Sequence, residues 1–197
     1  MKFISFILLV FPFVLVAQSY NFVISNGSDV RLNGGYLTLN NTAFQNAGDF
    51  QAAVSTVVMR GNVSKVYSGI GGGGYTRFGD LEIEKSANDV YLTGDILVYK
   101  NLIMSSGNLD LYGFELEIGI GANGSIVGES ETTRIYGPIG GEVVKKVVLN
   151  APTNENPGNI GLGFTSTGNL GYTIIRRRHT QFPLGGGTNI ERHFNID

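Results

Sequence analysis

The sequence predicts an all-β protein in which a parallel β-helix-like solenoid is followed by a partial β-sandwich-like unit. First, 29 of the 197 residues are glycine and only 15% are charged, a composition that disfavours helices. Second, short runs that alternate apolar and polar residues are separated by Gly, Asn, Asp and Ser, as in short strands joined by turns. Third, apolar pairs recur about every 20 residues, a period typical of stacked solenoid turns. An ordinary β-sandwich is the alternative.

Residues 1–19 predict a secretory signal peptide. Lys2 precedes a largely apolar run over residues 3–16, and the small residues Ala17 and Ser19 follow it, as at a signal-peptidase cleavage site. The apolar run is too short to span a bilayer comfortably. We therefore expect a mature chain that is secreted or held at the cell surface and has no transmembrane segment. An uncleaved anchor is the alternative.

Residues 20–140 are expected to form the solenoid repeats. Alternation predicts short strands of about 3–5 residues, at residues 36–39, 55–59, 80–84, 90–92, 96–98, 102–104, 109–111 and 116–118. Residues 43–60 are also assigned to strands, because Val54 and Val57 are among several β-branched residues that disfavour a helix there. The alternation directs one apolar set inward: Leu81, Ile83, Leu102, Met104, Leu109, Leu111, Leu116 and Ile118.

The spacing of these residues predicts which strands stack. Leu81 and Leu102 are 21 residues apart, Val90 and Leu109 are 19 apart, and Ile96 and Leu116 are 20 apart. A solenoid turn buries its apolar face only against its neighbours, so equivalent residues of successive turns are expected to contact one another. The polar residues between them, such as Glu82, Asp110 and Glu117, are expected on the outer surface.

The composition changes near residues 137–141. Residues 18–140 carry 7 basic and 12 acidic residues, a net charge of -5, whereas residues 141–197 carry 6 basic and 4 acidic residues, a net charge of +2. Strands are expected at residues 143–149, 160–165, 172–178 and 190–196. We assign residues 141–197 to a partial β-sandwich-like domain. Because the last strand runs into the C-terminus, this domain is expected to be truncated.

Four sets of residues resemble a known class of proteins: 44–50 with 55–61; 75–83; 90–98 through 102–111; and 162–166 with 176–179 and 190–196. They resemble large secreted surface proteins of Bacteroidetes-type bacteria that are exported by the type IX secretion system. The resemblance implies an adhesin-like or structural role at the cell surface. Such proteins usually end in a C-terminal sorting domain, which this sequence lacks, so the resemblance also implies a fragment of a longer polypeptide.

Two groups of residues are candidate ligand-binding positions. Several tyrosines in the repeats could form a strip that stacks on sugar rings, and Tyr91 and Tyr112 are the candidates singled out; the others are Tyr67, Tyr75 and Tyr99. Tyrosine is also common in strands for purely structural reasons. Arg176 and Arg178 could pair with polyanionic glycans. Strand alternation sends Arg177 to the opposite face, which splits this basic cluster.

Metal and catalytic chemistry have weaker support. A histidine site would need the rings of His179 and His193 to converge beside a carboxylate such as Glu191, and we favour ordinary strand residues instead. The chain has no cysteine. A further acidic group could bind calcium or cleave glycans: Asp80, Asp89, Asp95 and Asp110. The spacing of 15 among three of them does not match the repeat, so we favour turn residues. We predict no catalytic, cofactor-binding or metal-binding residue.

The sequence therefore predicts a secreted or cell-surface β-repeat protein with a structural or adhesin-like role and no catalytic activity. Its expected partners are extracellular glycans or surface polymers, and further domains of a longer polypeptide. The net charge of -2 argues against nucleic acid as a partner. The alternative is a carbohydrate-binding or carbohydrate-cleaving β-helix module, which requires an aromatic row or a pair of carboxylates in a cleft.

Overall fold

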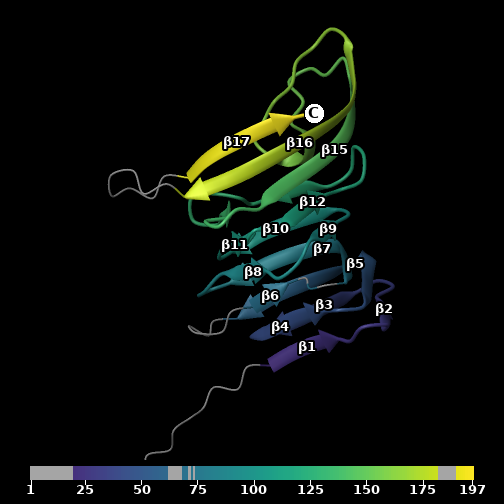
Figure 1. Ribbon diagram of the computed structural model, residues 1–197, viewed down its shortest axis with the longest axis vertical. Helices are drawn as coiled ribbons and strands as arrows, with labels where there is room; N and C mark the ends of the chain where they lie inside the picture. The colour runs from purple at the N-terminus through teal and green to yellow at the C-terminus, as the bar shows by residue number, and fades with distance from the viewer. Residues whose placement is uncertain (1–19, 62–67, 71, 73, 182–189) are drawn as a thin grey trace, which may run out of the picture.

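The computed structural model describes residues 20–61, 68–70, 72, 74–181 and 190–197. These residues form a β-solenoid of about 5 turns, which confirms the predicted all-β class and solenoid architecture. The turns stack from β1 at one end of the molecule to β15, β16 and β17 at the other (Figure 1). Among the described residues, no helix is long and apolar enough to cross a membrane. The predicted signal peptide lies outside the described residues.

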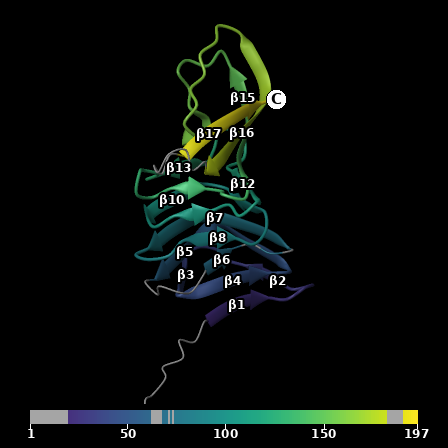
Figure 2. The same cartoon turned by 60° about the vertical axis from the view of Figure 1, so that its left-hand side comes forward.

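Each turn of the solenoid contributes strands to three sides, and strands on one side pair in parallel (Figure 2). Side A contains β1 (Tyr20–Ile24), β4 (Thr42–Asn46), β6 (Ser68–Ile70), β8 (Val90–Leu92), β11 (Leu109–Asp110) and β14 (Ile135–Tyr136). Side B contains β2 (Asp29–Arg31), the first parts of β5 (Asp49–Gly61) and β7 (Tyr75–Lys85), then β9 (Ile96–Val98), β12 (Glu115–Ile118) and β15 (Glu142–Asn150). Side C contains β3 (Tyr36–Asn40), the second parts of β5 and β7, β10 (Asn101–Ser106) and β13 (Ser125–Val127).

Two strands of the solenoid are at least twice the predicted length of 3–5 residues because they continue around a corner. β5 has 13 residues and β7 has 11, and the register between them shifts between Ala52 and Thr56. Gly79 lies at this corner in β7. A Cβ atom at Gly79 would lie 2.6 Å from the carbonyl oxygens of Ala52 and Ser55, closer than real contacts allow. A glycine is therefore required where two turns approach closely at the corner.

The core consists of ladders of apolar side chains in register. On side C, one such ladder is Leu37, Val57, Leu81, Leu102 and Ile126. The last four of these residues have no solvent exposure. Each side chain is covered by the turns above and below it, so burial continues along the length of the solenoid.

The predicted stacking of strands is confirmed residue by residue. Leu102 pairs with Leu81 in β10 and β7, and Leu109 pairs with Val90 in β11 and β8. Leu116 pairs with Ile96 in β12 and β9. All eight residues predicted to point inward are buried. Strict two-residue alternation therefore determines the inner face of these strands.

The C-terminal strands extend the solenoid as an antiparallel sheet. β15 pairs in parallel with β12 and antiparallel with β16 (Asn169–Gln181), which pairs with β17 (Ile190–Ile196). The strands predicted at 143–149, 172–178 and 190–196 are present. The division of the chain into separate domains at residue 141 stays a prediction.

The strand predicted over residues 160–165 is wrong. This region follows a 3-10 turn at Pro157–Asn159 and forms only an isolated bridge between Glu155 and Phe164. Pro157 has no N–H to donate, and Gly158 and Asn159 adopt φ angles of 67° and 52°. These backbone angles turn the chain, so the apolar residues that follow do not form an extended strand.

Two buried cations cover the C-terminal end of the solenoid. Lys145 in β15 has no solvent exposure and donates hydrogen bonds to the carbonyl oxygens of Ile118, at 3.2 Å, and Asn123. Burial lowers the pKa of Lys145. Arg177 in β16 is also fully buried and pairs with Glu129 at 2.8 Å. The last turn thus ends against two buried cations whose terminal nitrogens bind oxygen atoms of the same chain.

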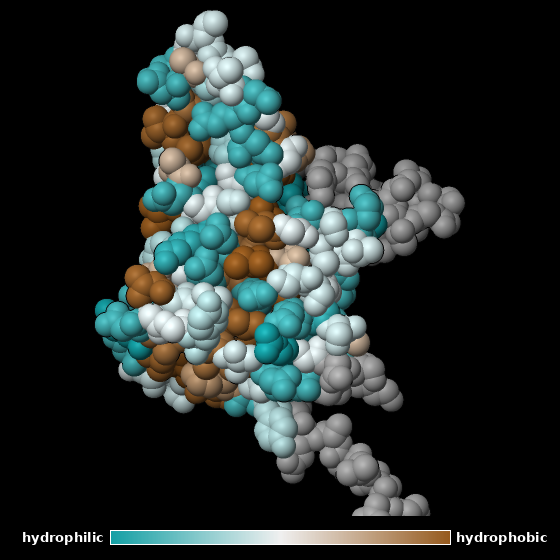
Figure 3. All heavy atoms as spheres, turned by 180° about the vertical axis from the view of Figure 1, so that it is seen from behind, coloured by the Kyte–Doolittle hydropathy of each residue, from teal (hydrophilic) through white to brown (hydrophobic). Residues whose placement is uncertain are grey.

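Exposed apolar residues are distributed along the length of the molecule. Viewed from behind, they alternate with hydrophilic ones on the surface (Figure 3). Val54, Ile139 and Tyr172 are examples that are 58%, 64% and 63% exposed. Scattered exposed apolar side chains are normal for a folded protein and do not by themselves define a binding site.

Candidate functional site

The outer surface of side A carries a pocket of about 410 Å³, which we name the aromatic pocket. It is lined by Asn88, Asp89, Tyr91, Asp110, Tyr112 and Tyr136. Tyr91, Asp110 and Tyr136 are paired across successive turns in β8, β11 and β14. Their strand neighbours Val90, Leu109 and Ile135 are buried, so alternation directs these three side chains outward in a column along the solenoid axis.

Tyr91 and Tyr112 form an aromatic pair at this pocket. Their ring centroids are 5.6 Å apart and the ring planes are inclined by 53°. Both residues were predicted as ligand-binding candidates, and the structure brings them together. A tilted pair of partly exposed rings offers apolar surface on which a flat, weakly polar ligand could pack.

The backbone at Tyr112 is unusual for an aromatic residue. Its φ angle is +49°, in the left-handed region that favours Gly and Asn, and Gly113 follows with φ +88°. The N–H of Tyr112 donates to Asp110 Oδ1 at 2.8 Å, which stabilises the turn. A left-handed conformation costs an L-residue about 1–2 kcal/mol. The backbone conformation therefore does not explain why a tyrosine occupies this position. The contact between the Tyr112 ring and Tyr91 does.

Two carboxylates make the aromatic pocket negative. Asp89 accepts a hydrogen bond from Asn108 Nδ2 at 2.9 Å on one oxygen and from the Tyr136 hydroxyl on the other. Burial raises the pKa of Asp110, the hydrogen bond from the Tyr112 N–H opposes this, and the nearby charge of Asp89 adds to the increase. None of the described residues that line the pocket is basic.

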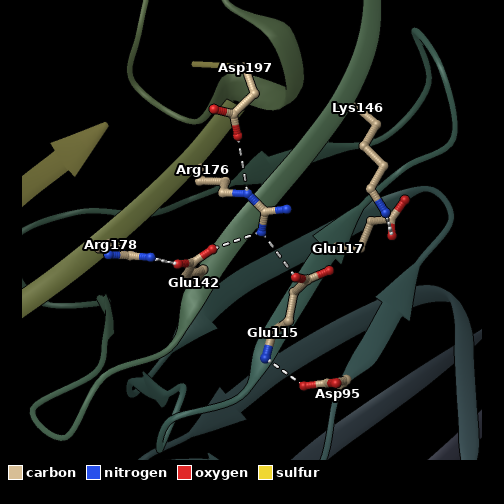
Figure 4. A network of polar contacts seen from close by, with 8 residues as sticks. All are labelled: Asp95, Glu115, Glu117, Glu142, Lys146, Arg176, Arg178 and Asp197. Atoms are coloured by element: carbon tan, nitrogen blue, oxygen red, sulfur yellow. Dashed lines mark hydrogen bonds and ion pairs between the residues drawn. The ribbon is translucent and has the colours of Figure 1, made fainter. Parts of the chain in front are cut away.

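A second polar region lies on side B, where β16 meets the solenoid (Figure 4). Arg176 Nη1 lies 2.9 Å from Glu142 Oε2 and 3.3 Å from Glu115 Oε2, and Arg178 also pairs with Glu142. The remaining contacts of this network join Lys146 to Glu117 at 2.6 Å, Arg176 to Asp197 at 3.8 Å, and the Glu115 N–H to Asp95 at 2.8 Å. Two depressions of about 540 and 510 Å³ beside the network both include Asp95 and Glu115.

The contacts in this network shift the pKa values of Glu142, Lys146 and Arg176. Burial raises the pKa of Glu142, but hydrogen bonds from Arg176 and Arg178 outweigh this effect and hold it below its usual value. The hydrogen bond that Lys146 donates to Glu117 raises the pKa of Lys146, and the bond that Arg176 donates to Glu142 raises the pKa of Arg176. Each cation is matched by a carboxylate of the same chain, so the network attaches β16 to the solenoid.

Arg176 and Arg178 occupy the positions that alternation predicts. Both point to the outer face of β16 and pair with Glu142, whereas Arg177 is buried on the opposite face. Their charges are already compensated within the chain, so this arrangement favours a structural role. Their suggested contact with polyanionic glycans stays a prediction.

Of the four acidic residues considered for calcium or catalysis, Asp89 and Asp110 meet in the aromatic pocket, whereas Asp80 and Asp95 lie outside it. Asp80 Oδ1 accepts the Asn101 N–H at 3.1 Å and Asp95 Oδ1 accepts the Glu115 N–H at 2.8 Å, so each binds the backbone of the next turn. Asp110 lies on side A in β11. In the part of the chain that the structure describes, no cluster of three or more His, Cys, Asp or Glu residues could hold a metal ion.

The remaining sequence candidates are not among the described residues that line the aromatic pocket. Tyr67 and the side chains of Tyr75, His179, His193 and Glu191 lie outside the described residues. Tyr99 follows β9 on side B and is not among the lining residues.

Asn88 and Tyr136 are the pocket residues that sequence reasoning missed, and Tyr136 shows the reason. The register advances by 19 residues from Val90 to Leu109 but by 26 from Leu109 to Ile135, because the chain between β12 and β14 is longer. A period near 20 therefore does not bring Tyr136 into the column of Tyr91. The short β-forming pair at 135–136 was the available signal.

The fold and the pocket together define a three-sided β-solenoid with an aromatic, acidic pocket on side A. Comparison of the chain with protein-family models, curated proteins and solved structures gave no match.

Proposed function

We propose that this chain is the glycan-binding solenoid of an adhesin-like extracellular protein, and that it binds carbohydrate in the aromatic pocket. The observation that carries the proposal is the Tyr91–Tyr112 ring pair beside Asp89 and Asp110 in one cavity. Aromatic rings pack against the apolar C–H faces of sugars, and carboxylates accept hydrogen bonds from sugar hydroxyls. The pocket places both kinds of group within one site of about 410 Å³.

The solenoid suits an adhesive role because it presents its outer residues on a regular, internally bonded frame. Parallel pairing joins each turn to the next, and the core ladders fix the direction of the outward side chains. The signal-peptide pattern of residues 1–19 and the absence of cysteine from the sequence support export without a disulfide framework.

Carbohydrate cleavage is the competing activity, because Asp110 has a raised pKa beside a second carboxylate. Catalysis by two carboxylates needs oxygens that are available to the scissile bond. Both oxygens of Asp89 already accept hydrogen bonds, from Asn108 and Tyr136, and Asp110 Oδ1 accepts the Tyr112 N–H. This arrangement favours binding over cleavage.

A glycan array probed with the protein tests the proposal. We expect the wild-type protein to bind at least one class of glycan, and Tyr91→Ala and Tyr112→Ala each to lose that binding. Tyr36→Ala is the matched control, because Tyr36 is 80% exposed on side C and lies outside the pocket. Binding that survives both pocket substitutions would refute the proposed site. Release of reducing or unsaturated ends from a bound polymer would establish cleavage instead.

A further inference from the structure

We propose that the aromatic pocket recognises the protonated amino group of an amino sugar, so that its ligand is a glycan with free amines. This inference rests on the proposed glycan-binding function and specifies the chemistry of the ligand. Its basis is the combination of two carboxylates with no basic residue among the described lining residues, aromatic faces and space for a sugar ring in a single cavity.

The charge of the pocket favours a cationic ligand. Asp89 and Asp110 both line it, and none of the described lining residues is Lys, Arg or His. The hydrogen bonds that Asp89 accepts come from the neutral groups of Asn108 and Tyr136, which leave its charge in place. In a partly desolvated cavity an ammonium group gains more from two carboxylates than it does in water.

Asp110 offers an oxygen for direct contact with such a ligand. Its Oδ1 accepts the Tyr112 N–H at 2.8 Å, while Oδ2 has no hydrogen-bond partner among the described residues. Each N⁺–H···O⁻ hydrogen bond to a carboxylate is stronger than a bond between neutral groups. An ammonium group bound at Oδ2 would also offset the repulsion between Asp110 and Asp89.

The tyrosine rings add a second attraction for a cation. Ring faces carry negative electrostatic potential, and a cation within about 6 Å of a ring centroid is attracted to it. The ring centroids of Tyr91 and Tyr112 are 5.6 Å apart and the ring planes are inclined by 53°. The two ring faces therefore point in different directions around the pocket. The Tyr136 hydroxyl bonds to Asp89, which fixes the third ring at the same site.

The size of the pocket favours an amine carried on a sugar over a small free amine. The column of Tyr91, Asp110 and Tyr136 crosses three successive turns, and the cavity of about 410 Å³ falls within the range of small-molecule sites. A neutral sugar would leave both carboxylates uncompensated, and a uronate would be repelled by them.

Isothermal titration with matched oligosaccharides tests the inference. The probes are glucosamine oligomers, the same oligomers after N-acetylation, and galacturonate oligomers of equal length. We expect the glucosamine oligomers to bind about tenfold more tightly than the acetylated ones, from the charge and cation–π terms together. We expect this preference to decrease as salt is added, because charge attraction is screened. We expect no binding of galacturonate.

Asp110→Asn provides the variant for this test. Asparagine keeps the side-chain oxygen that caps the Tyr112 N–H, so the turn is retained while the charge is removed. The preference for glucosamine over its acetylated form should be lost. Asp29→Asn, at an exposed aspartate on β2, is the control and should keep the preference.

The possible failures are distinguishable. Equal binding of acetylated and free amino sugars, or binding of galacturonate, would overturn the amino-sugar inference and leave the glycan-binding function intact. An absence of binding to every glycan, whatever its charge, would overturn both. The titration of the wild-type protein decides these outcomes even if the variant fails to fold.

Discussion

Replacing Tyr112 by asparagine should separate binding from stability. The φ angle of +49° at Tyr112 costs a tyrosine about 1–2 kcal/mol, and asparagine tolerates this conformation better. The substitution also removes the ring pair with Tyr91, a contribution of about 0.5–1.5 kcal/mol. These effects oppose each other, so we expect the free energy of unfolding to change by less than about 1 kcal/mol.

Chemical denaturation followed by far-UV circular dichroism measures the stability of Tyr112→Asn, and titration with the best-binding glycan measures its affinity. A change of 1 kcal/mol corresponds to a shift of about 2–4 °C in Tm for a chain of this size. Affinity should decrease at least about tenfold, because half of the aromatic pair is lost. Destabilisation by more than about 3 kcal/mol would show that the ring is a structural element. Unchanged affinity would show that it does not contact the ligand.

Three further substitutions test the solenoid itself. In a urea titration, Leu102→Ala should lower the free energy of unfolding by about 2–5 kcal/mol, because Leu102 is fully buried in a core ladder. The control is Ile103→Ala on the same strand, which should lower it clearly less because Ile103 is partly exposed. Gly79→Ala should lower the free energy of unfolding by about 1–3 kcal/mol in the same titration, because the added Cβ would lie 2.6 Å from carbonyl oxygens. The control is Gly168→Ala, which should have little effect because the nearest atom would be 4.0 Å away. Glu142 has a folded-state pKa below its unfolded value, so its contribution to stability is complete above the unfolded pKa and is lost as the pH falls through the folded pKa. The free energy of unfolding of Glu142→Gln should therefore decrease less than that of the wild type between neutral and acidic pH. If the two proteins showed the same dependence on pH, the ion pairs of Glu142 would not contribute to stability.

The inner face of the solenoid could be predicted from the sequence because its physical rule is local. Leu81 and Leu102 are buried since alternation in each strand allows one inner face, and their spacing equals one turn of the solenoid. The rule gave the correct pairing for the strands between residues 81 and 118. It failed at Tyr136, because the length of the connection before β14 depends on loop residues that carry no alternation.

The polar groups inside the molecule could not be predicted by the same rule. Alternation places Arg177 opposite Arg176 and Arg178, but it does not indicate that Lys145 and Arg177 are both buried and bind carbonyl oxygens or Glu129 at the end of the solenoid. Their burial depends on partners that are distant in the sequence and that only the assembled fold brings near. The aromatic pocket has the same origin: Tyr91 and Tyr112 were identified as candidates, but their contact and the two carboxylates beside them follow from the register of three turns.

A crystal structure of the protein with a bound glucosamine oligosaccharide would test the account most directly. We predict a sugar ring against Tyr91 and Tyr112, with its ammonium group within hydrogen-bond distance of Asp110 Oδ2. A sugar bound on another side of the solenoid, or an aromatic pocket that stays empty at saturating oligosaccharide, would contradict it.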